Sequence, residues 1–229
     1  MYLKTNGIEL YYEIAGQGAP VITGGQGEPV ILLHGNGEDH TIFDVLIKRL
    51  SESRMVYAID SRDHGKSSKV KDLDYGDMME DVAAFIRELD IHRPIVYGFS
   101  DGGIMGLLLA IKYPGLISKL IISGANTAPD GAKRIYMILL RILYFFTRDR
   151  KAKLMLTQPN ITDAELNTIT APTLVLAGSR EFVKDEHTKN IANNIRGSVL
   201  KILEGETHDS YVIHSEKLYD AIEPFIGEA

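Results

Sequence analysis

The hydrophobic positions of this chain gather in short runs, and most of these runs end in a Gly, His, Ser or Asp residue. Near-continuous apolar runs are typical of strands that are buried on both faces of a sheet. The segment Ile8–Ile14 alternates with polar residues instead, and it predicts an edge strand. The apolar runs that we expect to form buried strands are residues 29–33, 54–60, 94–99, 119–124, 172–178 and 199–203.

Segments with apolar residues at helical spacing lie between these runs. The helices that we expect cover residues 41–51, 75–89, 102–113, 132–146, 187–194 and 211–226. Alternating strands and helices indicate βαβ units and a mostly parallel sheet, in a single α/β domain over residues 1–229. Functional sites in such sheets lie at the carboxyl ends of the strands, so the residues that directly follow each strand are the first candidates.

The composition narrows the possible function classes. The chain has 25 Lys+Arg against 31 Asp+Glu, and this net charge of −6 disfavours nucleic acid as the main partner. It has no cysteine, which excludes disulfides, Cys-ligated zinc, iron–sulfur clusters and thiol catalysis. The first residues contain no apolar leader, and the longest apolar run, residues 135–146, is too short to span a bilayer. We therefore expect a cytoplasmic protein without an integral membrane segment.

The strongest motif is Gly98-Phe99-Ser100-Asp101-Gly102, which follows an expected strand and opens an expected helix. This context is the one that a nucleophile elbow requires. The tight turn would hold Ser100 in a strained backbone conformation, and the glycines on either side would avoid clashes. The N–H groups of the following helix would favour a developing oxyanion beside Ser100.

A serine nucleophile needs a base that accepts its proton. Among the seven histidines, His208 alone follows a strand after the elbow, in Gly205-Glu206-Thr207-His208. The carboxylate that orients such a histidine is expected after an earlier strand. Glu181 lies nearest the end of the strand 172–178, but Asp185 remains an alternative and Asp130 is a third candidate.

A second glycine-rich turn, His34-Gly35-Asn36-Gly37, follows the strand 29–33. Such a turn frees backbone N–H groups, and those of Asn36 and Asp101 could together bind an oxyanion. We expect His34 itself to brace this loop. No pattern such as H-E-x-x-H indicates a metal, so we expect neither a metal nor a cofactor.

Two further patterns need an interpretation. Gly65-Lys66-Ser67 resembles the end of a P-loop, but Asp60 stands where that motif requires its first glycine, so we reject nucleotide binding. Residues 16–22 nearly repeat as residues 25–31, which we interpret as a longer surface hairpin. The second copy is favoured as the strand because it leads directly into the His34 turn.

In their order along the chain, these motifs resemble the α/β-hydrolase superfamily, and they cover nearly the whole sequence. They include His34-Gly35, the elbow, the strand 172–178, Gly205-x-x-His208 and the segment Asp60-x-Arg62-x-His64-Gly65-x-Ser67. The resemblance implies an α/β-hydrolase fold, with a mostly parallel central sheet of about eight strands and helices on both faces.

The resemblance also implies a triad of Ser100, Glu181 and His208, with the Asn36 and Asp101 amides as oxyanion donors. Glu181 departs from the aspartate that the superfamily usually has at this position, so Asp185 stays open. The superfamily inserts a cap where this chain has residues 126–170, and here we expect a short, apolar, helical one. Leu139, Leu143 and Phe146 recur there at helical spacing and are candidate substrate-binding residues. The same surface could instead pack on its own domain, form a homodimer or contact a membrane surface.

These residues favour a serine hydrolase that cleaves a small ester or thioester through an acyl-enzyme on Ser100. Its expected partner is a small-molecule acyl substrate. Acyl transfer, perhydrolysis, lactone opening and C–C bond hydrolysis use nearly the same residues and are alternatives. The hypothesis of a different class is a non-catalytic binding protein on the same fold, because a fold alone does not determine function.

Overall fold

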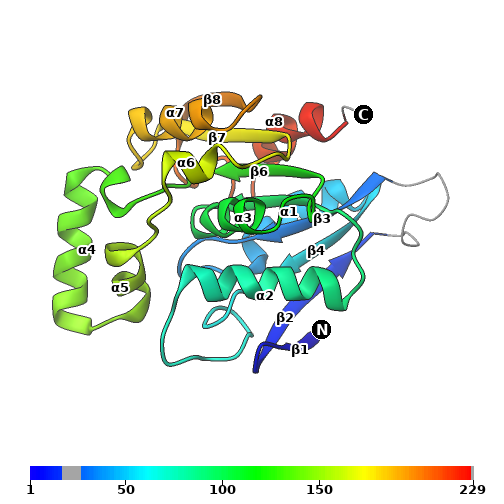
Figure 1. Ribbon diagram of the computed structural model, residues 1–229, viewed down its shortest axis with the longest axis horizontal. Helices are drawn as coiled ribbons and strands as arrows, with labels where there is room; N and C mark the ends of the chain where they lie inside the picture. Colours follow the sequence, from blue (N-terminus) through cyan, green and yellow to red (C-terminus); the bar gives the residue numbers. More distant parts are fainter. Residues whose placement is uncertain (17–26, 228–229) are drawn as a thin grey trace.

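The computed structural model describes residues 1–16 and 27–227. A single eight-stranded sheet runs through them in the order β1-β2-β4-β3-β5-β6-β7-β8 (Figure 1). The pairs β1–β2 and β2–β4 are antiparallel, and all later pairs are parallel. The strands are β1 (Tyr2–Thr5), β2 (Ile8–Ala15), β3 (Gly27–Leu33), β4 (Arg54–Ile59), β5 (Ile95–Phe99), β6 (Lys119–Ser123), β7 (Thr173–Arg180) and β8 (Val199–Thr207).

Helices cover both faces of this sheet (Figure 1). The apolar residues of α2, α3 and α7 join one buried cluster, and those of α1 and α8 join the cluster on the opposite face. The described helices are η1 (His40–Phe43), α1 (Asp44–Leu50), α2 (Tyr75–Glu88), α3 (Asp101–Lys112), η2 (Pro129–Gly131), α4 (Arg134–Thr147), α5 (Arg150–Thr157), α6 (Asp163–Leu166), α7 (Asp185–Asn194) and α8 (Glu216–Gly227). The predicted α/β-hydrolase fold, with its mostly parallel eight-stranded sheet, is therefore confirmed.

Strands form at all the predicted segments, and Ile, Val and Leu side chains fill both faces of the sheet centre. Every residue of β5 is buried, as a strand covered on both faces requires.

Two placements were wrong. The segment Ile8–Ile14, expected at an edge, belongs to β2, which lies between β1 and β4. The run 199–203, expected to be buried on both faces, belongs to β8, which is an edge strand without a buried residue. The short strand β1 was not predicted, since its four residues lie at the sheet edge with only Thr5 buried. The segment 17–26, which contains part of the repeated sequence, lies outside the described residues, while the second copy continues into β3 as expected.

We predicted a helix over residues 211–226, and the predicted start is wrong. Residues 211–214 form a turn, and α8 begins only at Glu216. His214 has a φ of 51°, a left-handed conformation that cannot continue into a right-handed helix. The apolar pattern at Tyr211 and Val212 reflects burial of the turn against the sheet rather than helical periodicity.

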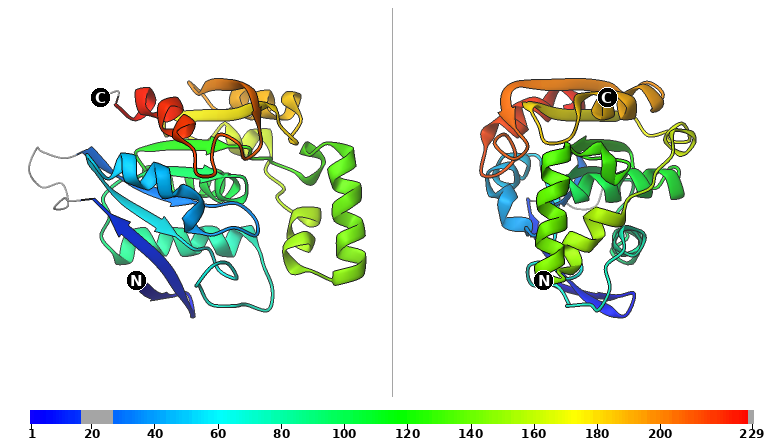
Figure 2. Two further views of the ribbon diagram at one scale, coloured as in Figure 1. Left: turned by 180° about the vertical axis from the view of Figure 1, so that it is seen from behind. Right: turned by 90° about the vertical axis from the view of Figure 1, so that its left-hand side faces the viewer.

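Helices α4 and α5 form a hairpin at one end of the molecule, outside the layers that cover the sheet (Figure 2). They lie in the segment 126–170 where a short helical cap was expected. The predicted helix over 132–146 corresponds to α4, whereas α5 and α6 were not predicted. In residues 1–16 and 27–227, no helix is both long enough and apolar enough to cross a bilayer.

Candidate active site

Ser100 lies at the tight turn between β5 and α3, with a φ of 52° and a ψ of −113°. The turn is fixed by hydrogen bonds, because the Ser100 N–H donates to Ser123 O at 2.8 Å and its carbonyl accepts from Ile104 N at 3.1 Å. A positive φ at a non-glycine residue costs backbone energy and persists only where the surroundings impose it. This backbone geometry is that of a nucleophile elbow.

The two glycines of the elbow are required by close backbone approach. A Cβ atom on Gly98 would lie 2.1 Å from the carbonyl oxygen of Gly102. A Cβ atom on Gly102 would lie 2.1 Å from the carbonyl oxygen of Leu33, at the end of β3. A side chain at Gly102 would push the elbow away from β3, and one at Gly98 would distort the elbow's own backbone; either change would displace Ser100.

His208 follows β8, and Glu181 follows β7. The His208 Nδ1 and Glu181 Oε1 atoms are joined by a short hydrogen bond. The imidazole lies between the rings of Phe99 and Phe182, with centroid distances of 4.8 and 4.0 Å. Phe99 directly precedes Ser100, so the structure brings Ser100, His208 and Glu181 to the same edge of the sheet.

The three candidate acids differ sharply in their surroundings. Glu181 is 2% exposed, and its Oε1 also accepts from the Phe182 N–H at 2.9 Å. Asp185 is the first residue of α7 and is exposed, and Asp130 is exposed in η2. In the described part of the chain, neither aspartate contacts His208, whereas Glu181 does.

The side chain of His34 stabilises the turn in which it lies. The His34 Nε2 atom accepts from the Ser61 N–H at 3.0 Å, and its Nδ1 atom lies 2.8 Å from Gly35 O. Burial lowers the pKa of His34, which keeps the ring neutral for both contacts. His34 therefore holds the loop, as its position had indicated.

Asn36 and Asp101 are joined by a hydrogen bond, in which Asn36 Nδ2 donates to Asp101 Oδ2 at 2.8 Å. Asp101 is the first residue of α3 and is 2% exposed. Burial raises the pKa of Asp101, while hydrogen bonds from Asn36 and Tyr75 act in the opposite direction. The contact holds the His34 turn against the helix N-terminus, beside Ser100.

Glu38 is a further carboxyl group at this edge, and no motif had indicated it. Its Oε2 atom accepts from the Gly35 N–H at 2.9 Å. A Cβ atom built on Gly35 would lie 2.7 Å from Glu38 Oε2 and 3.1 Å from Ser100 Cβ, so the carboxyl lies close to Ser100. Burial raises the pKa of Glu38 to about 7.

Two cavities that share wall residues lie on this side of the molecule, and one of them reaches Ser100. A small one of about 20 Å³ is lined by Ser100, Asp101 and Tyr75 together with Phe182 and residues of the segment 126–170. An apolar one of about 400 Å³ lies under α4 and includes Leu139 and Leu143 in its wall. Phe146, also predicted to bind substrate, is 78% exposed and lines neither cavity. The residues that line both cavities are Ala132, Met137, Met155 and Phe182.

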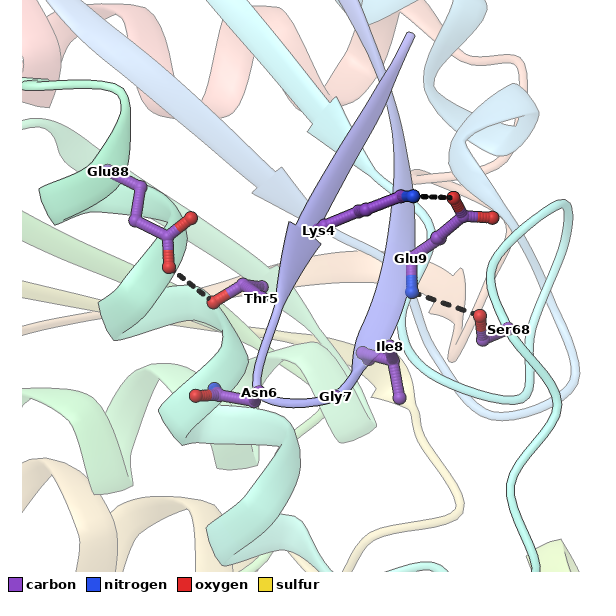
Figure 3. Close-up of a pocket in the computed structure, with 8 residues that line it drawn as sticks. All are labelled: Lys4, Thr5, Asn6, Gly7, Ile8, Glu9, Ser68 and Glu88. Carbon is purple, nitrogen blue, oxygen red and sulfur yellow. Dashed lines mark hydrogen bonds and ion pairs between the residues drawn. The ribbon is translucent and has the colours of Figure 1, made fainter.

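Another cavity, of about 580 Å³, lies far from these residues, beside the β1–β2 hairpin (Figure 3). Its lining residues make ordinary surface contacts, such as the Lys4–Glu9 ion pair at 3.6 Å and the Thr5–Glu88 hydrogen bond at 2.7 Å. None of its lining residues contributes to the Ser100 edge.

Asp39, His40 and Asp60 place potential ligand atoms within 4.8 Å of one another. Hydrogen bonds already engage these atoms, because Asp60 accepts from the His40 N–H at 2.9 Å and from the Lys66 N–H at 2.8 Å, and Asp39 caps η1. His40 Nδ1 and Asp60 Oδ1 are also 2.7 Å apart. The cluster ties the loop 60–67 to η1.

The fold and the elbow together define an α/β protein with a strained serine at the carboxyl edge of a parallel sheet. Residues 28–211 match the family described as alpha/beta hydrolase fold, and the chain belongs to that family.

Comparison with individual proteins agrees with this family. A serine hydrolase of Mus musculus, BPHL, is 26% identical over 256 residues, covering 98% of this chain and 85% of that protein. An ethanol acetyltransferase of Eremothecium cymbalariae is 34% identical over 97 residues, a match that covers 42% of this chain and only 27% of the acetyltransferase. The solved structure of an esterase from Exiguobacterium antarcticum shares the fold, with a TM-score of 0.82 and 22% identity over 97% of each chain.

Proposed function

We propose that this chain is a serine hydrolase that cleaves a small ester or thioester through an acyl-enzyme on Ser100. The observation that supports this most strongly is the Glu181–His208 hydrogen bond at the sheet edge that also holds the strained Ser100. Its full-length similarity to a serine hydrolase also supports the proposal.

In this mechanism, His208 accepts the hydroxyl proton of Ser100 as the oxygen attacks the substrate carbonyl carbon. Glu181 accepts a hydrogen bond from Nδ1, which orients the ring and stabilises the imidazolium that forms. His208 then donates the proton to the leaving alcohol or thiol. A water molecule, activated by the same histidine, releases the acid from Ser100.

The backbone amides of Asn36 and Asp101 would bind the oxyanion of the tetrahedral intermediate. The first N–H groups of a helix have no partner within the helix, and the N-terminus of α3 adds a favourable dipole. The Gly35 N–H is already engaged by Glu38, so it is not available to the oxyanion, and the proposed donor is the next amide, that of Asn36. Preorganised donors of this kind typically contribute a factor of about 10² to 10³ to kcat.

The lining of the larger cavity supports an uncharged substrate. Only apolar side chains and backbone surround the larger cavity under α4, apart from the hydroxyl of Tyr136. An uncharged acyl group therefore fits better than a charged one, because burying an unpaired charge is costly. No cofactor is required for any step.

A fluorophosphonate probe tests the proposal, because it reacts with an activated serine hydroxyl. We expect stoichiometric labelling of the peptide that contains Ser100, loss of labelling in Ser100→Ala, and slow labelling in His208→Ala. Ser53→Ala, at an exposed serine far from the site, is the matched control and should label like the wild type. A folded wild-type protein that stays unlabelled would instead indicate a binding protein on this fold.

A further inference from the structure

Helix α4 has no buried residue along its whole length, although it is one of the most apolar segments of the chain. It contacts α5 and η2, and in Figure 2 it stands clear of the layers that cover the sheet. Its inner side is formed by Met137, Leu140 and Tyr144, which are half-buried at helical spacing. A helix of a globular protein normally turns polar residues outward, so the composition of the outer side needs an explanation.

The outer face of α4 consists of Ile135, Ile138, Ile142, Phe145 and Phe146, with exposed fractions of 59, 39, 49, 65 and 78%. These positions follow one another by three, four, three and one residues, which places them on one side of a helix. A continuous apolar face of five large side chains is far more than the scattered surface hydrophobics that soluble proteins tolerate. We call this set the outer face.

The segment that carries the outer face has a charge opposite to that of the rest of the protein, although one of its basic residues, Arg150 of α5, is ion-paired with Asp63 at 3.2 Å. Residues 133–153 contain seven Lys or Arg and one Asp, a net charge of +6, whereas the whole chain has −6 and the remaining residues therefore −12. Arg134 and Arg141 flank the outer face one above the other, seven residues apart. Both are exposed, and within residues 1–16 and 27–227 neither forms an ion pair.

We propose that the outer face of α4 docks the protein onto an anionic lipid bilayer. The helix would lie in the plane of the membrane surface, with the Phe and Ile side chains among the acyl chains and the arginines at the headgroups. An apolar face flanked by basic residues on an otherwise acidic protein is the combination that such docking needs, because the basic groups are attracted to the anionic leaflet.

The same charge pattern disfavours a homodimer through this helix, which is one of the alternatives that the sequence left open. A two-fold symmetric contact would bring the basic segment of one copy against the basic segment of the other. Like charges brought together in this way oppose association. The proposal does not depend on the serine-hydrolase function, since it uses a different face of the cap.

Flotation with vesicles tests the docking surface. The probe is vesicles of phosphatidylcholine and phosphatidylglycerol in equal parts, compared with vesicles of phosphatidylcholine alone. We expect binding to the anionic vesicles that weakens with added salt, and little binding to the neutral ones. Ile142→Ser with Phe145→Ser should weaken the binding at least about tenfold, because each removed side chain takes apolar area out of the bilayer.

Two further variants separate the contributions. Arg134→Gln with Arg141→Gln should weaken binding to anionic vesicles but leave the weak binding to neutral ones unchanged. Val199→Ser with Ile202→Ser, at comparably exposed apolar residues of β8, is the matched control and should bind like the wild type. Thermal unfolding followed by circular dichroism confirms that each variant is folded.

Two results would overturn the proposal. One is equal vesicle binding by the wild type and the folded Ile142→Ser/Phe145→Ser protein. The other is a wild-type protein that does not bind anionic vesicles and sediments as a dimer, together with a double variant that sediments as a monomer. The second result would assign the outer face to another copy of the chain.

Discussion

At the scale of single residues, Glu181 differs from Asp185 in burial and in its contact with His208. Burial of a carboxylate is costly unless hydrogen bonds compensate it, and Glu181 receives two at Oε1, from His208 and from Phe182 N. The longer glutamate side chain reaches the imidazole directly from the end of β7. Reach and burial therefore favour Glu181 as the proposed acid over the exposed aspartates.

Glu181→Gln keeps the shape of the side chain but removes the charge that stabilises the imidazolium. We expect kcat to fall about 10²- to 10⁴-fold at neutral pH, measured with a p-nitrophenyl ester. Asp185→Asn is the matched control and should retain nearly full activity. The reverse pattern would assign the role to Asp185, and a modest loss in both would point to shared carboxylates or to Asp130.

Glu38→Gln tests the half-buried carboxyl beside Ser100. Burial raises its pKa in the folded protein from 4.5 to about 7. A raised folded-state pKa means that the free energy of unfolding falls as the pH rises from about 4.5 to about 7, because the unfolded chain releases the proton first. Above about pH 7 the contribution of Glu38 to the free energy of unfolding is constant, because the carboxyl is ionised in both states.

The variant removes this titration while keeping an oxygen that accepts from Gly35 N–H. Between pH 4.5 and 7, we expect the midpoint of thermal unfolding to decline less in Glu38→Gln than in the wild type. Glu52→Gln, at an exposed glutamate, should follow the wild type. Parallel curves for the wild type and Glu38→Gln across this range would show that Glu38 titrates normally.

At the scale of elements, the two sides of α4 have different expected roles. Leu139 and Leu143 line the apolar cavity, while Ile135 lies on the outer face. Leu139→Ala with Leu143→Ala should enlarge the cavity. We expect the ratio of kcat/KM for long-chain over acetyl p-nitrophenyl esters to rise about tenfold, since one methylene is worth roughly that factor in an apolar pocket.

The thermal stability of this double variant should change little, because both side chains are about half-exposed, at 56 and 48%. Ile135→Ala, with 59% exposure, should leave the chain-length profile in solution unchanged. An unaltered profile in the double variant, or a loss of folding, would show that these leucines only pack the hairpin.

At the scale of the whole molecule, the sequence predicted the parts of the fold that repeat a strong pattern. The central strands are continuous apolar runs, and α2 has a clear helical period. Helix α3 is buried on nearly all sides, so the elbow that precedes it is its stronger signal, a local motif whose glycines are required by local contacts. Strand β1 was missed because only one of its four residues is buried, so no apolar run marks it. The turn at residues 211–214 was predicted as helix because its buried residues imitate the start of a helical period.

The site could be predicted only where a residue directly follows a strand. Ser100, His208 and Glu181 do so. Tyr75 begins α2, and Met155 reaches the site from the cap, so only tertiary packing brings them there. Glu38 lies near the predicted His34 turn, but nothing in the spacing shows that its carboxyl folds back onto Gly35.

The acyl-enzyme on Ser100 is tested most directly by measuring the mass of the protein while it turns over a p-nitrophenyl ester. Rapid acid quenching should trap a species heavier by one acyl group, and peptide mapping should place that group on Ser100. Ser100→Ala should show no acylated peptide, and its kcat should fall by several orders of magnitude, about 10³-fold or more. Turnover without acylation of Ser100, or turnover that survives in folded Ser100→Ala, would contradict the proposed mechanism.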